Sequence, residues 1–324
     1  MKKFLALSLA LAMSLSLAAC GGNGGGSSSG SGSASTSGSG SAADGAQKIG
    51  ISMPTQSLER WNRDGSYLDQ QFQAAGYETI VTYCDLGYDL IYAPGNQYTD
   101  AVLQAAEEYP DVAFALLNGG TGTPEQAVNG NVTSLLPDAQ QVGWIAGALA
   151  GLMTETGTIA FIGGMELDTT VGKYNGYAEA AAYVGEQAGK TVSTLDIVYS
   201  GDFSASDKGI EFAKAMIDEG ADVFFGDASA VDSGARQAID EANAANGSVT
   251  IFDIAQPSDL LGQNECIICS QVTDNASLVG LCMEAVQSGT FGGEVIYGTM
   301  QNGVLSAGGL SDLVPAEVQD QYLA

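Results

Sequence analysis

Residues 138–164, DAQQVGWIAGALAGLMTETGTIAFIGG, decide the fold of this chain. Asp138–Met153 is apolar at helical spacing and predicts a helix. That helix carries glycines that permit close packing, namely Gly143, Gly147 and Gly151. Thr158–Ile162 then predicts a buried strand that ends at a glycine pair. A helix followed by a buried strand is the unit from which parallel sheets are built.

The same alternation extends outward in both directions. The predicted strands are Lys48–Met53, Glu78–Tyr83, Tyr88–Ala93, Val112–Leu117, Thr194–Tyr199, Asp222–Phe225, Val249–Phe252, Cys266–Gln271 and Glu294–Tyr297. The predicted helices are the segment from Ser57 to Gly76, then Asp100–Tyr109, Tyr174–Ala188, Ala205–Glu219, Ser233–Ala245 and Ala276–Ser288. This order predicts an α/β fold with parallel sheets that have helices on both faces. Residues 47–324 are enough for two lobes of ordinary domain size.

The N-terminus predicts export. Lys2 and Lys3 precede an apolar run of about 14 residues, which is shorter than the ~20 that span a bilayer and is typical of a secretory signal. The run ends in Leu17-Ala18-Ala19-Cys20, which resembles the lipobox of bacterial lipoproteins. The resemblance implies a signal peptide over residues 1–19 and a lipid on Cys20; an uncleaved anchor is the alternative. Residues 20–46 are mainly Gly and Ser and predict a linker, because they bury too little apolar area to form a core.

Composition excludes several classes of function. A formal net charge of −28 removes the basic surface that nucleic-acid binding requires. The sequence has no histidine, which removes Ser-His-Asp and Cys-His nucleophiles and His-ligated metal sites, and no cofactor is expected. Cys266 and Cys269 form a single CxxC, which predicts a buried strand near a turn rather than a zinc site. A disulfide is the alternative for an exported chain.

Several short segments between about Tyr88 and Val314 occur in the same order as in a known family. They include YDLI (88–91), YPDV (109–112), NVTSLL (131–136), GTIAFIGGM (157–165) and GTFGG (289–293). Together they resemble the basic membrane lipoprotein family of ABC-transporter binding proteins, of the purine nucleoside receptor type. The resemblance implies the periplasmic-binding-protein type I fold, in which a hinge joins two doubly wound parallel-sheet lobes. On this basis we expect residues 48–133 plus about 264–288 in the first lobe, and about 134–263 plus 289–324 in the second.

The resemblance also implies a function. We expect capture of a small polar solute in a cleft between the lobes, with a purine nucleoside first and a sugar second. The expected partners are ABC permease subunits and, through the N-terminal lipid, the extracytoplasmic face of a bacterial cell membrane. A receptor that feeds a sensor kinase without transport is one alternative. A hydrolase that uses paired carboxylates is another, although no Asp or Glu pair has a distinctive spacing.

Candidate ligand-binding residues come from two arguments. Asn118 and Asp227 follow predicted strands, where ligands of open α/β sheets bind. The resemblance implies that Phe203 is a platform for a ring and that Asp253 accepts hydrogen bonds from ligand hydroxyls. A loop-packing Phe and a turn carboxylate are the respective alternatives. Thr273 stands where family members usually carry a lysine.

The first lobe departs from the family in two ways. Residues 52–62 resemble the start of xylose-type sugar-binding proteins, which implies that Arg60 binds the ligand; Trp61 is either a ring platform or a core residue. Only four residues separate Tyr83 from Tyr88, where both families place a crossover helix. Parallel neighbours need a crossover of about a dozen residues, so we expect a lost helix or an unusual strand order, and reduced stability of this lobe.

Overall fold

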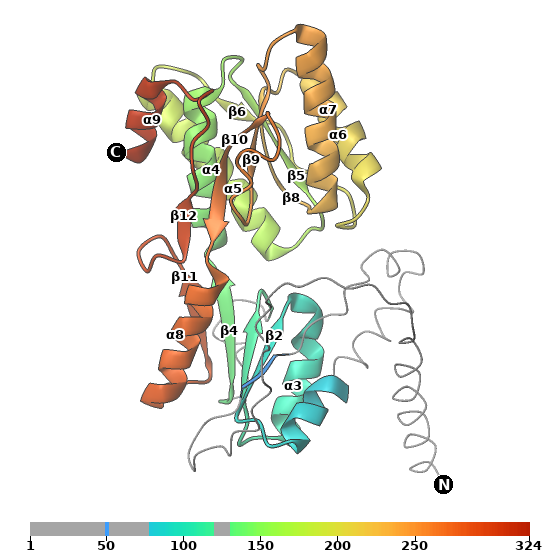
Figure 1. Cartoon of the computed structure of the whole chain (residues 1–324), viewed down its shortest axis with the longest axis vertical. Coiled ribbons are helices and arrows are strands. Elements are labelled where there is room, and N and C mark those ends of the chain that lie inside the picture. Colours follow the sequence, from blue (N-terminus) through green and yellow to red (C-terminus); the bar gives the residue numbers. More distant parts are fainter. Residues whose placement is uncertain (1–48, 52–77, 120–129) are drawn as a thin grey trace, which may run out of the picture. The chain divides into compact units, whose positions relative to one another are not determined.

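The structure is a computed structural model that describes residues 49–51, 78–119 and 130–324. Residues 47–324 form one compact unit. The predicted signal peptide, linker and Cys20, the helix from Ser57 to Gly76, and the candidate residues Arg60 and Trp61 lie outside the described residues. Two sheets organise the described part of the chain (Figure 1).

The first sheet has five parallel strands in the order β1-β2-β3-β4-β11. Its strands are β1 (Ile49–Ile51), β2 (Leu90–Pro94), β3 (Ala113–Leu117), β4 (Val132–Pro137) and β11 (Glu294–Gly298). A short 3-10 turn, η2 (Asn96–Tyr98), leads into α3 (Thr99–Glu108), which lies on the opposite side of the sheet from α8 (Asn275–Ser288) (Figure 1). Ile91, Phe114 and Val102 form the centre of the core beneath α3.

The second sheet has the order β12-β10-β9-β8-β5-β6, with β7 also paired to β5. Its strands are β5 (Thr158–Gly163), β6 (Ser193–Thr194), β7 (Val198–Tyr199), β8 (Val223–Asp227), β9 (Phe252–Ala255), β10 (Ile267–Thr273) and β12 (Leu305–Ala307). All pairings are parallel except that of β12 with β10.

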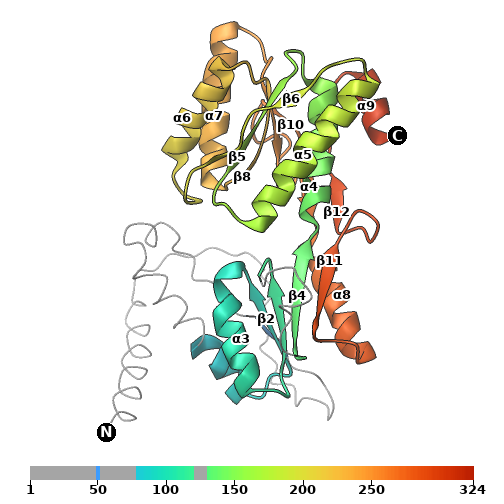
Figure 2. The same ribbon diagram turned by 180° about the vertical axis from the view of Figure 1, so that it is seen from behind.

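Helices cover both faces of the second sheet (Figures 1 and 2). They are α4 (Ala139–Met153) and α5 (Asp168–Gln187) on one face, and α6 (Ser206–Asp218) and α7 (Ala230–Asn246) on the other. Successive strand residues point to opposite faces, so Phe224 packs in the core under α6 and α7, whereas Phe225 packs in the core under α4 and α5. The C-terminal α9 (Ala316–Leu323) docks on α4, where the Tyr322 hydroxyl donates to Ile145 O at 3.0 Å. The α/β class and the helices on both faces are as predicted.

The segment 78–83 is helical, and its prediction as a strand is wrong. Residues 78–85 form helix in which Ile80 and Cys84, four apart, are buried at 0% and 7% exposure. Thr82 Oγ1 donates to Glu78 O at 2.7 Å, the bond that a threonine makes to the preceding helical turn. Gly87, at φ 74°, follows the helix as its left-handed cap. The β-branched composition suggested a strand, but burial recurs at helical spacing.

This helix removes the apparent gap in the first lobe. Because β1 pairs directly with β2 in parallel, the connection between them runs over residues 52–89 and includes the helix over 78–85. No crossover helix is missing at Tyr83–Tyr88, so the expected loss of stability has no structural basis.

Two further boundaries differ from the prediction. The Asn243 side chain forms hydrogen bonds with the backbone at the start of the predicted strand 249–252. Its Oδ1 accepts from Thr250 N and Ile251 N, and its Nδ2 donates to Ile251 O. The strand β9 therefore begins three residues later, at Phe252. The prediction also placed residues 264–273 in the first lobe and residues 294–298 in the second. The sheets pair them the other way, with β10 in the second sheet and β11 in the first.

The chain therefore passes between the sheets at three places in the described residues. These are between β4 and α4, between β10 and α8, and between β11 and β12. The strands β4 and β12 and the helix α9 were not among the predicted elements, and the predicted strand 194–199 is divided into β6 and β7.

Candidate functional site

One pocket of about 430 Å³ lies where strands of both sheets end. Gly95 and Asn96 follow β2, Asn118 follows β3, Gln256 follows β9, and Thr273 ends β10. Asp227 at the end of β8 and residues in the first two turns of α5 and α7 supply further polar side chains of the wall. This is the edge at which ligands of open α/β sheets bind.

The structure brings three of the predicted site residues together in this pocket. Asn118, Phe203 and Asp227 all line it. Asp253 does not line it, because the later start of β9 places this residue inside the strand, at 4% exposure. Thr273, which stands where a lysine was expected, also lines the pocket.

Asp227 is held by a network of short hydrogen bonds. Thr170 Oγ1 donates to its Oδ2 at 2.8 Å, and Lys173 Nζ donates to its Oδ1 at 2.8 Å. The Lys173 ammonium also donates to Gln256 Oε1 at 3.0 Å. The side chains of Lys173 and Asp227 are only 17% and 22% exposed. The carboxylate is therefore fixed in direction and its charge is paired, as in a preorganised binding wall.

A second ion pair lies deeper in the same wall. Arg236 Nε donates to Asp253 Oδ2 at 2.7 Å, and the two side chains are 13% and 5% exposed. The attraction of Asp253 raises the pKa of Arg236. Arg236 lines the pocket and Asp253 does not. The arginine is therefore the member of the pair that a ligand would meet.

Asp232 occupies the first turn of α7 and also lines the pocket. Its Oδ2 accepts from Ala228 N at 2.9 Å. Burial raises the pKa of Asp232 to about 7, against the lowering effect of the Ala228 hydrogen bond. This carboxyl group is thus poised to change its protonation state near neutral pH.

Phe203 is the aromatic residue in the pocket lining. The ring packs on the backbone of Gly164, where a Cβ would overlap the Phe203 side chain. Phe203 O accepts from Ala230 N at 2.9 Å, which ties the loop before α6 to the start of α7. The Gly163-Gly164 pair therefore provides space for an aromatic side chain.

The backbone of the pocket is unusual at two positions. Asn118 and Ser229 have φ values of 52° and 56°, and they are the non-glycine residues with positive φ in the described part of the chain. Both line the pocket. Positive φ values at non-glycine residues persist only where the surrounding structure holds the backbone in place, and they are found most often at functional sites.

Sequence reasoning missed Lys173, Arg236, Asp232 and Gln256. The first three lie on helices, whereas the sequence prediction concerned residues that follow strands. The available signal was the scarcity of positive charge, since the whole chain has 10 Lys and Arg residues against 38 Asp and Glu. In such an acidic chain, a basic residue near the start of a core helix is a candidate for a specific role.

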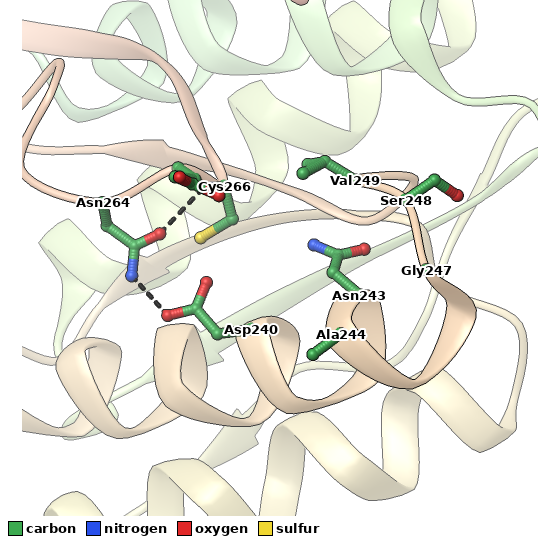
Figure 3. A pocket seen from close by; sticks show the side chains of 9 residues that line it. Asp240, Asn243, Ala244, Gly247, Ser248, Val249, Asn264 and Cys266 are labelled. Atoms are coloured by element: carbon green, nitrogen blue, oxygen red, sulfur yellow. Dashed lines mark hydrogen bonds between the residues drawn. The ribbon is translucent and has the colours of Figure 1, made fainter.

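A second pocket, of about 500 Å³, lies at the opposite edge of β9 and β10 (Figure 3). Its polar side chains serve the local backbone and each other. Asn264 Nδ2 donates to Asp240 Oδ2 at 2.6 Å, and Asn264 Oδ1 accepts from Cys266 N at 2.8 Å. Since ligands bind at the carboxyl ends of parallel strands, the smaller pocket is the better candidate.

Other expectations concern cysteines, metals and the membrane. Cys266 and Cys269 are buried and free, so the alternative of a disulfide between them is not realised. No group of three or more His, Cys, Asp or Glu residues in the described segments is placed to hold a metal ion. Among the helices of those segments, none has the length and apolarity to cross a bilayer.

Comparison with known proteins identifies relatives over most of the chain. The model of one family, described as ABC transporter substrate-binding protein, PnrA-like, matches residues 48–323. The ABC transporter nucleoside-binding protein BmpA of Lactococcus lactis is 26% identical over 82% of this chain and 78% of its own length. The CD4+ T-cell-stimulating antigen of Listeria monocytogenes is 28% identical over 57% of this chain, and the match spans about half (48%) of that relative.

A solved structure supports the fold. An ABC-transporter solute-binding protein from Aeropyrum pernix superposes with a TM-score of 0.62 at 25% identity, over 73% of this chain and 65% of that one. The predicted periplasmic-binding-protein type I fold is confirmed by this likeness together with the parallel sheets.

Proposed function

This chain belongs to the PnrA-like family of ABC-transporter substrate-binding proteins, and from that premise we propose that it captures a purine nucleoside in the pocket at the strand ends. The family is one of solute-binding proteins and not of enzymes. We further propose that the loaded protein delivers its solute to an ABC permease from the extracytoplasmic face of the membrane, held there by a lipid on Cys20.

The observation that carries the ligand assignment is an aromatic ring beside fixed polar groups. Phe203 offers a face on which a base can stack, whereas Asp227 and Arg236 offer an acceptor and a donor held by partners of their own. A pocket of about 430 Å³ has the capacity for a nucleoside-sized ligand. The Lactococcus relative is named as a nucleoside-binding protein, which agrees with this assignment.

A sugar is the second candidate ligand. The resemblance of residues 52–62 to xylose-type proteins favours it, and Arg60 would then bind the sugar. The paired acidic and basic groups of the pocket can also bind hydroxyl groups. Phe203 could stack on the face of a base or of a sugar, so direct titration with each ligand is what separates the two candidates.

Calorimetry with the purified full-length protein tests the proposal. We expect one purine nucleoside to bind per chain and xylose to bind weakly or not at all. Phe203→Ala should weaken nucleoside binding by about 1–3 kcal/mol, the usual worth of stacking one base on an aromatic ring. Tyr183→Ala is the matched control, since Tyr183 is a 56% exposed aromatic residue on α5 that does not line the pocket.

The outcomes separate the candidate functions. No heat with any nucleoside would refute the nucleoside assignment, and binding of xylose in its place would establish the sugar. Transport requires in addition that the loaded protein stimulate uptake by its permease in vesicles. Nucleoside binding with no such uptake would favour the sensing receptor.

A further inference from the structure

Arg236 has an incomplete set of hydrogen bonds. A guanidinium carries five N–H groups, and in Arg236 the Nε–H donates to Asp253 Oδ2 at 2.7 Å. Neither Nη atom donates to any residue that the structure describes. The side chain is nevertheless only 13% exposed. Buried donors without partners are costly, so the arrangement suits a guanidinium that completes its hydrogen bonds with a ligand.

The other basic residue in this wall differs. The Lys173 ammonium already donates to Asp227 and to Gln256. An ammonium has three N–H groups, so Lys173 has one donor left. Arg236 has its four Nη hydrogens left, and it is the basic residue of the described pocket wall that can donate two parallel hydrogen bonds. Because Asp253 balances its charge, the acceptor that it meets need not be an anion.

We propose that Arg236 reads the ligand in this pocket by donating a forked pair of hydrogen bonds to two adjacent acceptors, and that Asp253 acts as the positioning residue that aims the fork. This deepens the proposed function and rests on it. On a purine nucleoside, O6 and N7 of a 6-oxopurine are two adjacent acceptors, and arginine binds them in bidentate fashion. Adenine presents an amino donor beside N7 instead. The pocket therefore prefers guanosine and inosine to adenosine.

The assignment changes the role that the family resemblance implied for Asp253. Asp253 is 4% exposed and does not line the pocket, so its carboxylate contacts Arg236 rather than ligand hydroxyls. A buried carboxylate that receives Nε fixes the plane of the guanidinium. Arg236 and Asp253 thus form one recognition unit, of which only the arginine touches the ligand.

The test compares guanosine, inosine and adenosine by calorimetry with the full-length protein. We expect the wild type to prefer the two 6-oxopurine nucleosides by about tenfold or more, within the range of one bidentate arginine contact. Arg236→Lys keeps the positive charge beside Asp253 but lacks the fork, and should abolish that preference. The double variant Arg236→Gln with Asp253→Asn removes both charges together, so that no unpaired buried charge threatens folding. It should bind adenosine and guanosine with similar affinity.

Controls keep the result specific. Lys214→Gln removes the basic member of the exposed Lys214–Glu241 pair, which joins α6 to α7 and does not line the pocket, and it should leave the preference unchanged. Asp253→Asn alone should reduce the preference without moving adenosine affinity, which loss of folding would not do. Nucleoside binding with an unchanged guanosine-to-adenosine ratio in Arg236→Lys would overturn this inference alone. Absence of nucleoside binding in the wild type would overturn the proposed function and this inference with it.

Discussion

Asp232 is a carboxyl group of the pocket whose pKa lies near neutral pH. It lies in the first turn of α7, one turn before Arg236, and it is affected by the charges of Asp227, Asp253 and Arg236. Burial raises the pKa of Asp232 to about 7 from an ordinary value of 3.8. Between these values the folded protein holds a proton that the unfolded chain has released. The stability of the folded state therefore falls, on account of this group, as pH rises through that window.

We predict that Asp232→Asn makes the protein more stable than the wild type at pH 8 but not at pH 4. The amide keeps an oxygen for Ala228 N and removes the charge that burial disfavours. The gain at pH 8 should exceed about 1 kcal/mol, the equivalent of one unit of pKa shift. Thermal melts at pH 4, 6 and 8 measure it. Asp207→Asn, an exposed first-turn aspartate of α6, is the control and should show no such trend; an equal trend in both variants would refute the assignment.

The candidate site shows how far residue-level prediction reaches. Asn118 and Asp227 were predicted because a residue that follows a buried strand can be recognised from the sequence. Asp253 was predicted to follow its strand but lies inside it, because the strand begins three residues later than predicted. No local pattern shows that Thr250 N and Ile251 N donate hydrogen bonds to the Asn243 side chain instead of to a neighbouring strand. Lys173 and Arg236 gain their meaning from partners 54 and 17 residues away in the chain. Such pairings depend on the tertiary fold and leave no local pattern.

At the scale of elements, the pair α4 and α5 depends on glycine. A Cβ at Gly143 would overlap Lys173 O, and a Cβ at Gly151 would overlap Ala181 O. At the centre of the contact, a Cβ at Gly147 would overlap Tyr177 O. The predicted close packing at these glycines is confirmed. Backbone-to-backbone contact of this kind leaves no flexible side chain that can move aside.

We predict that Gly147→Ala destabilises the protein despite the higher helix propensity of alanine. Overpacking of a closely packed contact costs about 1–3 kcal/mol, which exceeds the roughly 1 kcal/mol that propensity returns. Urea titration measures the loss. Gly280→Ala on α8 is the control, because a Cβ there meets nothing within 4 Å. Increased stability of Gly147→Ala would show that the helices separate without cost.

Most elements could be predicted from periodicity, and the exceptions have local causes. The helices α3, α4, α6 and α8 end within a few residues of their predicted bounds, because their buried faces repeat at helical spacing. The prediction of a strand over 78–83 was wrong because it followed the β-branched residues Ile80, Val81 and Thr82. The buried residues Ile80 and Cys84 are instead four apart, which is helical spacing. The pairing of strands could not be predicted, because local sequence does not show that β11 pairs with β4 rather than with a strand of the second sheet.

At the scale of the whole molecule, the two sheets share a chain that passes between them three times in the described residues. Strand order rather than sequence order decides which segment belongs to which lobe. Every described pocket residue from the first sheet lies within two residues of a strand end. The same is true of Asp227, Gln256 and Thr273 in the second sheet. A binding site assembled from separate strand ends in this way depends on the complete fold, so it cannot be predicted from one contiguous sequence motif.

The last prediction concerns attachment of the whole chain to a membrane. The net charge of −28 opposes adsorption to anionic lipid, so retention at the membrane would depend on a covalent lipid at Cys20. One acyl chain gives only weak binding and two give stable anchoring. We predict that the wild type expressed in a bacterial host incorporates labelled palmitate and sediments with membranes, whereas Cys20→Ser does neither and is found in the supernatant. Cys84→Ser, which alters a buried cysteine and keeps Cys20, should label as the wild type does. Membrane retention of unlabelled Cys20→Ser would show that an uncleaved N-terminal segment, and not a lipid, anchors the protein.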